Sequence, residues 1–172
     1  DYVIVHRDQA DSLCDAIVRH AGRLYPRLAD NPDYTSIINQ RHRARLQSYL
    51  DDARGKGARL VEVNPSGESF RDDGARGSAK MAPVLVRGPT EDMLVMQEEI
   101  FGPILPIVEV ASAEEALRYV VDHPRPLALY YFDTDKKRIE TVLTHTHSGG
   151  VTINDCMLHV AEEHLPFGGV GP

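Results

Sequence analysis

The 172-residue sequence has no tryptophan, only 2 cysteines and no apolar run much longer than a strand. Two cysteines, Cys14 and Cys156, cannot build a disulfide framework, which predicts a reducing compartment. The apolar runs, such as residues 2–5, fall far short of the roughly 18 residues of a membrane helix, so no membrane span is expected. The sequence does not open with the pattern of a secretory signal. We therefore expect a cytoplasmic protein.

Positive charge is also scarce, with 19 Lys+Arg against 26 Asp+Glu and a net charge of −7. Phosphate backbones are bound by clustered cations, so we expect no nucleic-acid partner. One basic cluster is present, formed by Arg41, His42, Arg43 and Arg45. A solvated helix face explains such a cluster, and an anion contact is the alternative.

Strand and helix patterns alternate along the sequence. Strands are expected over residues 2–5, 60–63, 84–86, 105–110, 127–132 and 151–153. Apolar residues at three- and four-residue spacing predict helices between most of them. Residues 127–132 are almost wholly apolar, which is typical of a strand covered on both faces. The alternation predicts an α/β fold, a mostly parallel sheet flanked by helices.

Helix boundaries are marked by residues that can cap free backbone N–H groups. Asp8 is expected to cap the first helix, and a second helix is expected to follow Asn39. Ser112 and Glu115 form a capping box, in which each side chain satisfies a backbone N–H near the other residue. Asp133 or Thr134 is expected to cap the next helix. Residues 64–80 are rich in glycine and serine and predict a long mobile loop or a loose hairpin.

Two segments are candidates for the ligand-binding edge at the carboxyl ends of the strands, residues 97–103 and residues 154–169. In the first, Glu99 and Phe101 place a carboxylate near an aromatic ring. The carboxylate can accept hydrogen bonds from ribose hydroxyls while the ring packs on a flat heterocycle. The alternative for Glu99 is an exposed loop acid.

Cys156 is a candidate nucleophile, because His159 lies three residues further on. Thiolate catalysis requires a lowered thiol pKa and a base in contact, and the spacing does not establish either, so a loop or pocket-lining cysteine is the alternative. The pair His145 and His147 lacks companion ligands, and we predict no metal site. The sequence contains no phosphate-binding glycine-rich loop of the Gly-x-Gly-x-x-Gly or Walker type.

Three stretches resemble motifs of the aldehyde dehydrogenase family. Residues 99–103 resemble its Glu-x-Phe-Gly-Pro stretch, and residues 149–155 and 166–171 resemble its C-terminal motifs in the same order. The Asn-Asp variant followed by Leu-Pro-Phe-Gly-Gly-Val-Gly is similar to the class 3 branch, which acts on fatty and aryl aldehydes. Residues 30–39 resemble the bacterial coniferyl aldehyde dehydrogenases within that branch. The resemblance covers essentially the whole chain and implies the fold of the family's catalytic domain.

This resemblance implies a homodimeric, NAD- or NADP-dependent enzyme that oxidises aromatic or long-chain aldehydes to carboxylic acids through a thioester on a cysteine. It implies that Glu99 holds the nicotinamide ribose and that Phe101 lies beside it. The residues that it implies for the aldehyde tunnel are Asn154, Asp155, Cys156, His159 and Phe167.

In class 3 members the nucleophile's Gly-Gln-x-Cys stretch runs directly into Asp-Tyr-Val, which resembles residues 1–3 here. The resemblance therefore implies that the nucleophile, the general base and the Rossmann domain precede residue 1. Neither Cys14 nor Cys156 matches the nucleophile's motif, so we predict no catalytic residue in this chain. Residues 1–172 are expected to be a single truncated catalytic domain, inactive alone. The alternative is a non-enzymatic α/β binding or oligomerisation module.

Overall fold

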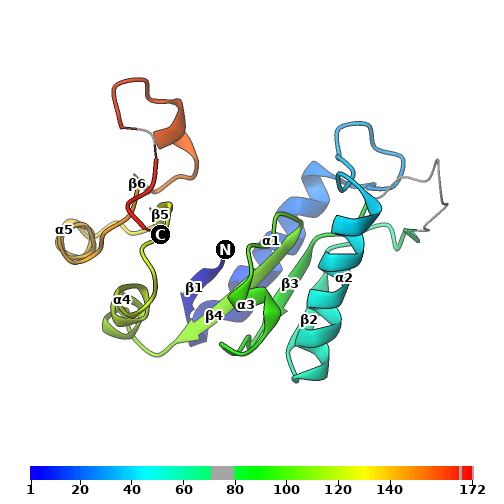
Figure 1. The fold of residues 1–172 in the computed structure, drawn as a ribbon, viewed down its shortest axis with the longest axis horizontal. Coiled ribbons are helices and arrows are strands. Elements are labelled where there is room, and N and C mark those ends of the chain that lie inside the picture. Colours follow the sequence, from blue (N-terminus) through cyan, green and yellow to red (C-terminus); the bar gives the residue numbers. More distant parts are fainter. Residues whose placement is uncertain (71–79, 167, 172) are drawn as a thin grey trace. The chain divides into compact units, whose positions relative to one another are not determined.

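The computed structural model describes residues 1–70, 80–166 and 168–171 (Figure 1). The chain divides into two compact units, Asp1–Val110 and Ala111–Pro172. The elements of the first unit are β1 (Val3–His6), the 3-10 turn η1 (Arg7–Gln9), α1 (Ala10–Leu24), α2 (Gln40–Gly55), β2 (Arg59–Glu62), β3 (Val84–Arg87), α3 (Leu94–Gln97) and β4 (Ile104–Val110). Those of the second unit are α4 (Ala113–Asp122), β5 (Ala128–Tyr131), α5 (Lys136–His145), β6 (Gly150–Ile153) and the 3-10 turn η3 (Leu158–Ala161).

The first unit is built on a four-stranded sheet in the order β1-β4-β3-β2. β1 and β3 each run parallel to β4, and β2 is antiparallel to β3. In the register, Val3 lies opposite Ile107 and Val84 lies opposite Ile104. The mostly parallel sheet predicted from the alternation of elements is confirmed.

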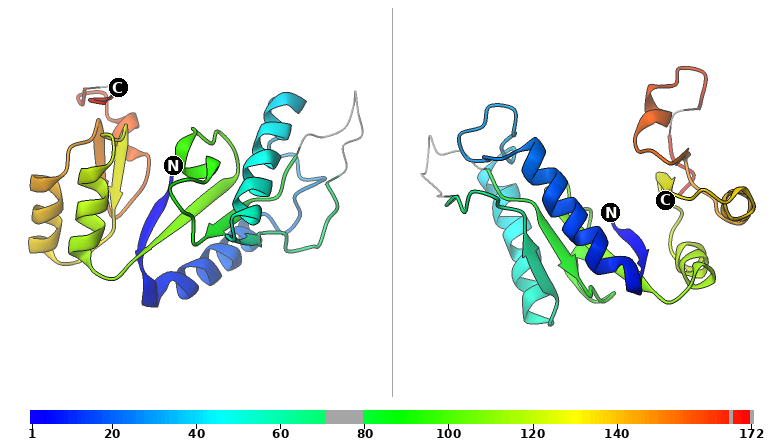
Figure 2. Two further views of the ribbon diagram at one scale, coloured as in Figure 1. Left: turned by 60° about the horizontal axis from the view of Figure 1, so that its bottom comes forward. Right: turned by 180° about the vertical axis from the view of Figure 1, so that it is seen from behind.

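Helices α1 and α2 cover opposite faces of this sheet (Figure 2). Successive side chains of a strand point to opposite faces. In β3, Val84 and Val86 accordingly pack in the cluster that holds Leu46 of α2, while Leu85 packs in the cluster that holds Cys14 of α1. Cys14 is 4% exposed and lies in the core as a small apolar residue.

The second unit holds a parallel pair of strands, with Ala128 of β5 opposite Gly150 of β6. The strand predicted over residues 127–132 is present, but the expectation that both faces are covered is wrong for this chain. All four residues of β5 are half-buried, and the flanking Phe132 is 59% exposed. Among the described residues, β5 pairs only with β6, so its other edge has no partner strand.

The helix predicted after Asn39 is present, and the predicted capping box at Ser112 is confirmed. The Asn39 side chain accepts a hydrogen bond of 2.9 Å from the His42 N–H at the start of α2. At the start of α4, Ser112 accepts from the Glu115 N–H at 3.2 Å. Glu115 in turn accepts from the N–H of Ala111, one residue before the expected partner, at 2.6 Å.

Two other caps differ from the expectation. Asp8 does not cap α1, because residues 7–9 form an extra 3-10 turn and Gln9 becomes the N-cap residue. The cap of α5 is Asp135, which accepts from the N–H groups of Lys137 and Arg138. Asp133 instead accepts from the Asp135 N–H at 2.8 Å.

Residues 71–79, the middle of the loop predicted over 64–80, lie outside the described residues. The described ends of that loop are held by hydrogen bonds, among them one of 2.9 Å from the Glu68 N–H to the Asn64 side chain. No helix in the described part of the chain is both long enough and apolar enough to cross a membrane.

Candidate functional site

The loop between α3 and β4 carries the predicted cofactor residues Glu99 and Phe101. Between them, the Ile100 side chain is 1% exposed and packs in the core. Phe101 has a backbone φ of 48°, a left-handed conformation that is uncommon for a residue with a side chain. This conformation turns the chain so that Ile100 is buried while the Phe101 ring is 75% exposed.

Arg45 of α2 holds this loop through hydrogen bonds to its backbone. Its guanidinium donates to the carbonyl oxygens of Glu99, at 2.7 Å, and Ile100, at 2.6 Å. It also donates to the Tyr49 hydroxyl at 2.8 Å. Hydrogen bonds from a charged donor are stronger than those from a neutral donor. Arg45 therefore fixes the backbone conformation of the loop at Glu99.

Gly102 allows the loop to lie directly on α2. A Cβ atom at this position would lie 2.4 Å from Cδ1 of Leu46, a residue that is fully buried. The contact distance of two carbon atoms is about 3.5–4.0 Å, so no larger residue fits without displacement. The glycine of the Glu-x-Phe-Gly-Pro stretch is therefore explained by close packing of the backbone.

Phe101 forms one wall of a groove of about 600 Å³ in the first unit. The groove is lined by Tyr34, Thr35, Ser36, Ile37, Ile38, His42, Phe101, Gly102 and Pro103. Glu99 is not part of this lining. Its side chain is exposed on the same loop.

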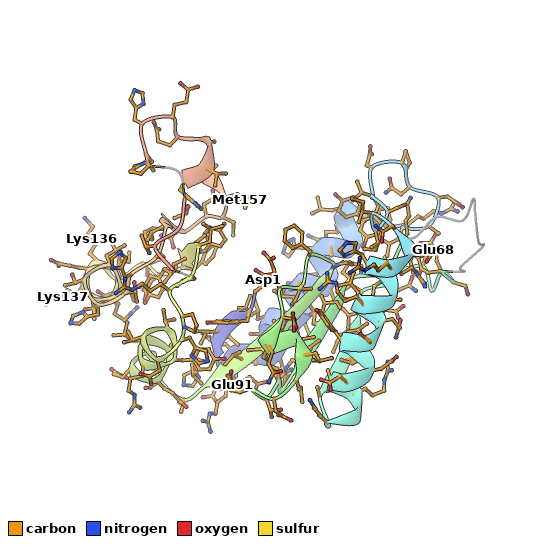
Figure 3. All side chains as sticks on the ribbon, viewed as in Figure 1. Asp1, Glu68, Glu91, Lys136, Lys137 and Met157 are labelled. Atoms are coloured by element: carbon orange, nitrogen blue, oxygen red, sulfur yellow. The ribbon has the colours of Figure 1, made fainter. Side chains whose placement is uncertain are left out.

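The segment that precedes the opposite wall, residues 28–33, is held by hydrogen bonds. Lys80 is 9% exposed, and its ammonium donates to the carbonyl oxygens of Leu28, Ala29 and Asn31 at 3.2, 3.0 and 2.6 Å. Glu68, labelled in Figure 3, accepts from the Leu28 N–H at 2.5 Å, and this hydrogen bond lowers its pKa.

Tyr34 connects this wall to the segment that leads into β3. Its hydroxyl donates to the carbonyl oxygen of Met81 at 2.6 Å. Burial, with a smaller contribution from Tyr25, raises the pKa of Tyr34 to about 12. Both walls of the groove are thus held by hydrogen bonds to other segments of the first unit.

The predicted substrate residues follow β6 in the second unit. Asn154 has a φ of 60°, and its side-chain amide makes both of its hydrogen bonds with Asp133. Oδ1 accepts from the Asp133 N–H at 2.9 Å, and Nδ2 donates to the Asp133 carbonyl at 2.9 Å. The Asn154 N–H donates to the Tyr131 carbonyl at 2.8 Å. Asn154 thereby extends the pairing of β5 and β6 by one residue.

Beyond Asn154 the chain turns outward and then returns to the sheet. Asp155 and Cys156 are exposed, and the Asp155 carboxylate accepts from the Cys156 N–H at 2.7 Å. His159 is half-buried, with Nδ1 lying 3.1 Å from the Thr152 hydroxyl. Phe167, the fifth predicted substrate residue, lies outside the described residues.

The structure therefore brings the predicted site residues together in two groups, one in each unit. Glu99 and Phe101 share the loop before β4, and Asn154, Asp155, Cys156 and His159 share the loop after β6. Of the two thiols, Cys14 is buried, and burial raises its pKa, whereas Cys156 is exposed. Within the described residues, no group of three or more His, Cys, Asp or Glu side chains is placed to hold a metal ion.

The sequence alone did not predict the structural role of the basic cluster at residues 41–45. The pattern favoured a solvated helix face for Arg45 and His42, whereas Arg45 holds the Glu99 loop and His42 lines the groove. The spacing of Arg45 and Tyr49 contained the signal, because residues four apart lie on the same face of a helix. Tyr49 is 5% exposed, which places Arg45 at the edge of the buried face.

Comparison with known proteins agrees with the resemblance in the motifs. Residues 1–172 match the model of the Aldehyde dehydrogenase family. A probable coniferyl aldehyde dehydrogenase of Caulobacter vibrioides is 48% identical over 172 residues, which are 100% of this chain and 35% of that protein. The coniferyl aldehyde dehydrogenase of a Pseudomonas species is 47% identical over 171 residues, covering 99% of this chain and 35% of that protein.

A solved structure with a similar fold represents the substrate-bound state of Staphylococcus aureus AldH. It superimposes with a TM-score of 0.86 at 37% identity, over 99% of this chain and 35% of that chain. The chain thus spans about a third of the length of the relatives that it matches.

Proposed function

The chain belongs to the aldehyde dehydrogenase family, and from this premise we propose that it forms part of an NAD(P)-dependent enzyme that oxidises aromatic or long-chain aldehydes, such as coniferyl aldehyde, to carboxylic acids. The observation that carries the proposal is the conformation of residues 99–103. Arg45 and Leu46 hold this loop so that Phe101 is turned out into a groove while Glu99 remains exposed on the same turn. Few purely structural loops expose a phenylalanine at a left-handed backbone position.

The residues present fit a nicotinamide cofactor. Phe101 presents an exposed aromatic ring, a surface on which a flat ring can pack. Glu99 supplies a carboxylate that can accept hydrogen bonds from ribose hydroxyls. When bound, a nicotinamide supplies the hydride acceptor that aldehyde oxidation requires. Phe101 and Glu99 would hold the nicotinamide in one orientation.

The aldehyde is proposed to bind at the loop after β6. Its exposed residues include Cys156 and Met157, whose side chains are of moderate size and low polarity. Apolar surface of this kind suits an aromatic or long-chain substrate. Asp155 and Phe167 are proposed to line the same site on the strength of the motif resemblance.

The chain by itself is proposed to be inactive. Cys14 is 4% exposed and its thiol pKa is raised, so it is unsuited to attack a carbonyl group. Cys156 does not match the nucleophile's motif. We expect no NADH or NADPH formation from the isolated chain with any aldehyde. Formation well above a no-protein control, abolished by Cys156→Ala, would restore Cys156 as a nucleophile.

The enzymatic proposal is tested in a chimera in which this chain replaces the matching third of the Pseudomonas coniferyl aldehyde dehydrogenase. We expect the chimera to form NADH or NADPH with coniferyl aldehyde. Glu99→Gln is expected to slow hydride transfer and to weaken cofactor binding, because a hydrogen bond to a charged group contributes about 1.5–3 kcal/mol. Glu98→Gln, on the neighbouring exposed acid, is the matched control and is expected to behave as the unaltered chimera.

Equal rates and equal cofactor affinities in the two variants would show that Glu99 is only an exposed acid. A well-folded chimera without activity would favour the alternative of a binding or oligomerisation module. Sedimentation of the active chimera tests the proposed homodimer.

A further inference from the structure

The loop after β6 is fastened to the sheet at both of its ends. At its start, Asn154 is bound to the backbone of Asp133 by two hydrogen bonds of 2.9 Å. At its far end, His159 of η3 lies against β6. The residues between these two points, Asp155, Cys156 and Met157, are exposed.

His159 meets β6 at two positions on the same face of the strand. Gly150 and Thr152 are two residues apart, so they project to the same side of the sheet. Nδ1 of His159 lies 3.1 Å from the Thr152 hydroxyl, within hydrogen-bonding distance. The imidazole ring lies so close to Gly150 that a Cβ atom there would be 2.3 Å from Cδ2 of the ring. The site of the ring exists only because residue 150 is a glycine.

β5 holds the same segment from the neighbouring strand. The Tyr130 and His159 ring centroids are 5.8 Å apart, and the Tyr130 hydroxyl lies 3.3 Å from the sulfur of Met157. Met157, labelled in Figure 3, has a φ of 65°, and its carbonyl accepts from the Val160 N–H at 3.0 Å. The hydrogen bond between Val160 and Met157 thus closes the turn that returns the chain to the sheet. His159 fixes this turn to β6.

We propose that His159 is a positioning residue, which fastens η3 to β6 through Thr152 and Gly150 and so fixes the conformation of residues 155–157. The motif resemblance implies that His159 lines the aldehyde tunnel. The geometry assigns it a different part, because its ring faces the strand pair and its Nδ1 faces Thr152. The consequence for aldehyde binding rests on the function proposed above.

Amide hydrogen exchange of the whole chain tests the fastening without any assay of activity. His159→Ala is expected to raise the exchange rate of the Val160 amide at least about tenfold, because local opening of η3 becomes easier. The Asn154 amide, which donates to the Tyr131 carbonyl at 2.8 Å, is expected to keep its rate within about twofold. An unchanged Val160 amide, or equal acceleration of both amides, would overturn the proposal.

Further variants separate the contributions of the ring and of the hydrogen bond. Gly150→Ala is expected to reproduce the effect of His159→Ala, because the added methyl group displaces the ring. Thr152→Val removes the hydroxyl and is expected to accelerate the Val160 amide, whereas Thr152→Ser retains the hydroxyl and is expected not to. His164→Ala is the matched control on a histidine whose side chain is 91% exposed. Acceleration by His164→Ala as large as that by His159→Ala would contradict a specific role for His159.

The chimera then tests the consequence for the substrate. His159→Ala is expected to raise the KM for the aldehyde at least about fivefold with a smaller change in kcat and an unchanged KM for the cofactor. His159→Asn, which offers Thr152 a polar partner, is expected to recover part of the loss. An unchanged KM for the aldehyde overturns the positioning role. An inactive unaltered chimera counts against the proposed function alone, because the exchange rates still decide whether His159 fastens the loop.

Discussion

The guanidinium of Arg45 donates a 2.7 Å hydrogen bond to the carbonyl oxygen of Glu99, 54 positions further along the chain. The same guanidinium lies 5.0 Å from the centre of the Tyr49 ring, within range of a cation–π interaction. A helix that covers one face of the sheet therefore also sets the backbone of the proposed cofactor loop. The stability of the first unit and the orientation of Glu99 depend on the same side chain.

Arg45→Met is expected to lower the free energy of unfolding by about 2 kcal/mol, since it removes charged hydrogen bonds but retains much of the aliphatic stem. Arg54→Met in the same helix is the control. Arg54 is a 63% exposed side chain paired with Asp51, and such surface pairs contribute about 0–1 kcal/mol. Urea titrations of the two variants and the unaltered chain measure the difference. Similar losses in both variants would show that the contacts of Arg45 add no more than an ordinary surface charge.

Interactions of short range were predictable from the sequence. Asn39 and Ser112 cap the N–H groups three residues further on, so the local sequence contains both partners. The alternation of strand and helix patterns was equally sufficient for the sheet of the first unit, which packs between α1 and α2. Asp8 was misjudged because an extra turn at residues 7–9, with His6 at its start, moves the helix boundary.

Interactions of long range were not predictable in the same way. The acceptors of Arg45 are main-chain carbonyls, and every residue has one, so no residue type identifies the partner. The left-handed conformation of Phe101 depends on the burial of Ile100 and on the contact between Gly102 and Leu46. Those contacts exist only after α2 has packed on the sheet. The motif resemblance identified the loop, but only the folded structure explains how it is held.

Gly102→Ala is expected to destabilise the chain by about 1–3 kcal/mol, because the methyl group would overlap the buried Leu46 side chain. Gly55→Ala is the matched control, since no atom lies within 4 Å of the position of its Cβ. The control is expected to be neutral or slightly stabilising. Leu46→Ala combined with Gly102→Ala should cost less than the sum of the single changes. Strict additivity in unfolding free energies would mean that the two side chains do not compete for space.

Lys80→Met is expected to lower the free energy of unfolding by about 2–3 kcal/mol. The change leaves the carbonyl oxygens of Leu28, Ala29 and Asn31 without their charged donor. Lys136→Met, on an exposed position of α5 labelled in Figure 3, is expected to change it by less than about 0.5 kcal/mol. The two variants lose the same charge, so a difference in urea midpoint reports on the contacts of Lys80. Equal midpoints would show that solvent replaces the ammonium without loss.

Tyr34→Phe is expected to make the chain less sensitive to alkali. Burial raises the pKa of Tyr34 to about 12, from 10.0 for an exposed tyrosine. The folded chain therefore holds this proton more tightly than the unfolded chain does, and the resulting stability is fully present below pH 10.0. It is lost progressively as the pH rises from 10.0 to about 12, where the phenol ionises in the folded chain as well.

The free energy of unfolding, measured between neutral pH and this alkaline range, should fall less steeply for Tyr34→Phe than for the unaltered chain. At neutral pH the variant should be less stable by about 1 kcal/mol, because the hydrogen bond to the Met81 carbonyl is lost. An absorbance titration of tyrosinate supplies an independent measurement, in which the group with the pKa near 12 should be missing from the variant. If the titration curves of the unaltered chain and the variant instead differ by a tyrosine of ordinary pKa, the prediction is wrong. That result would show that Tyr34 is solvated and that its hydrogen bond to Met81 does not hold the wall of the groove.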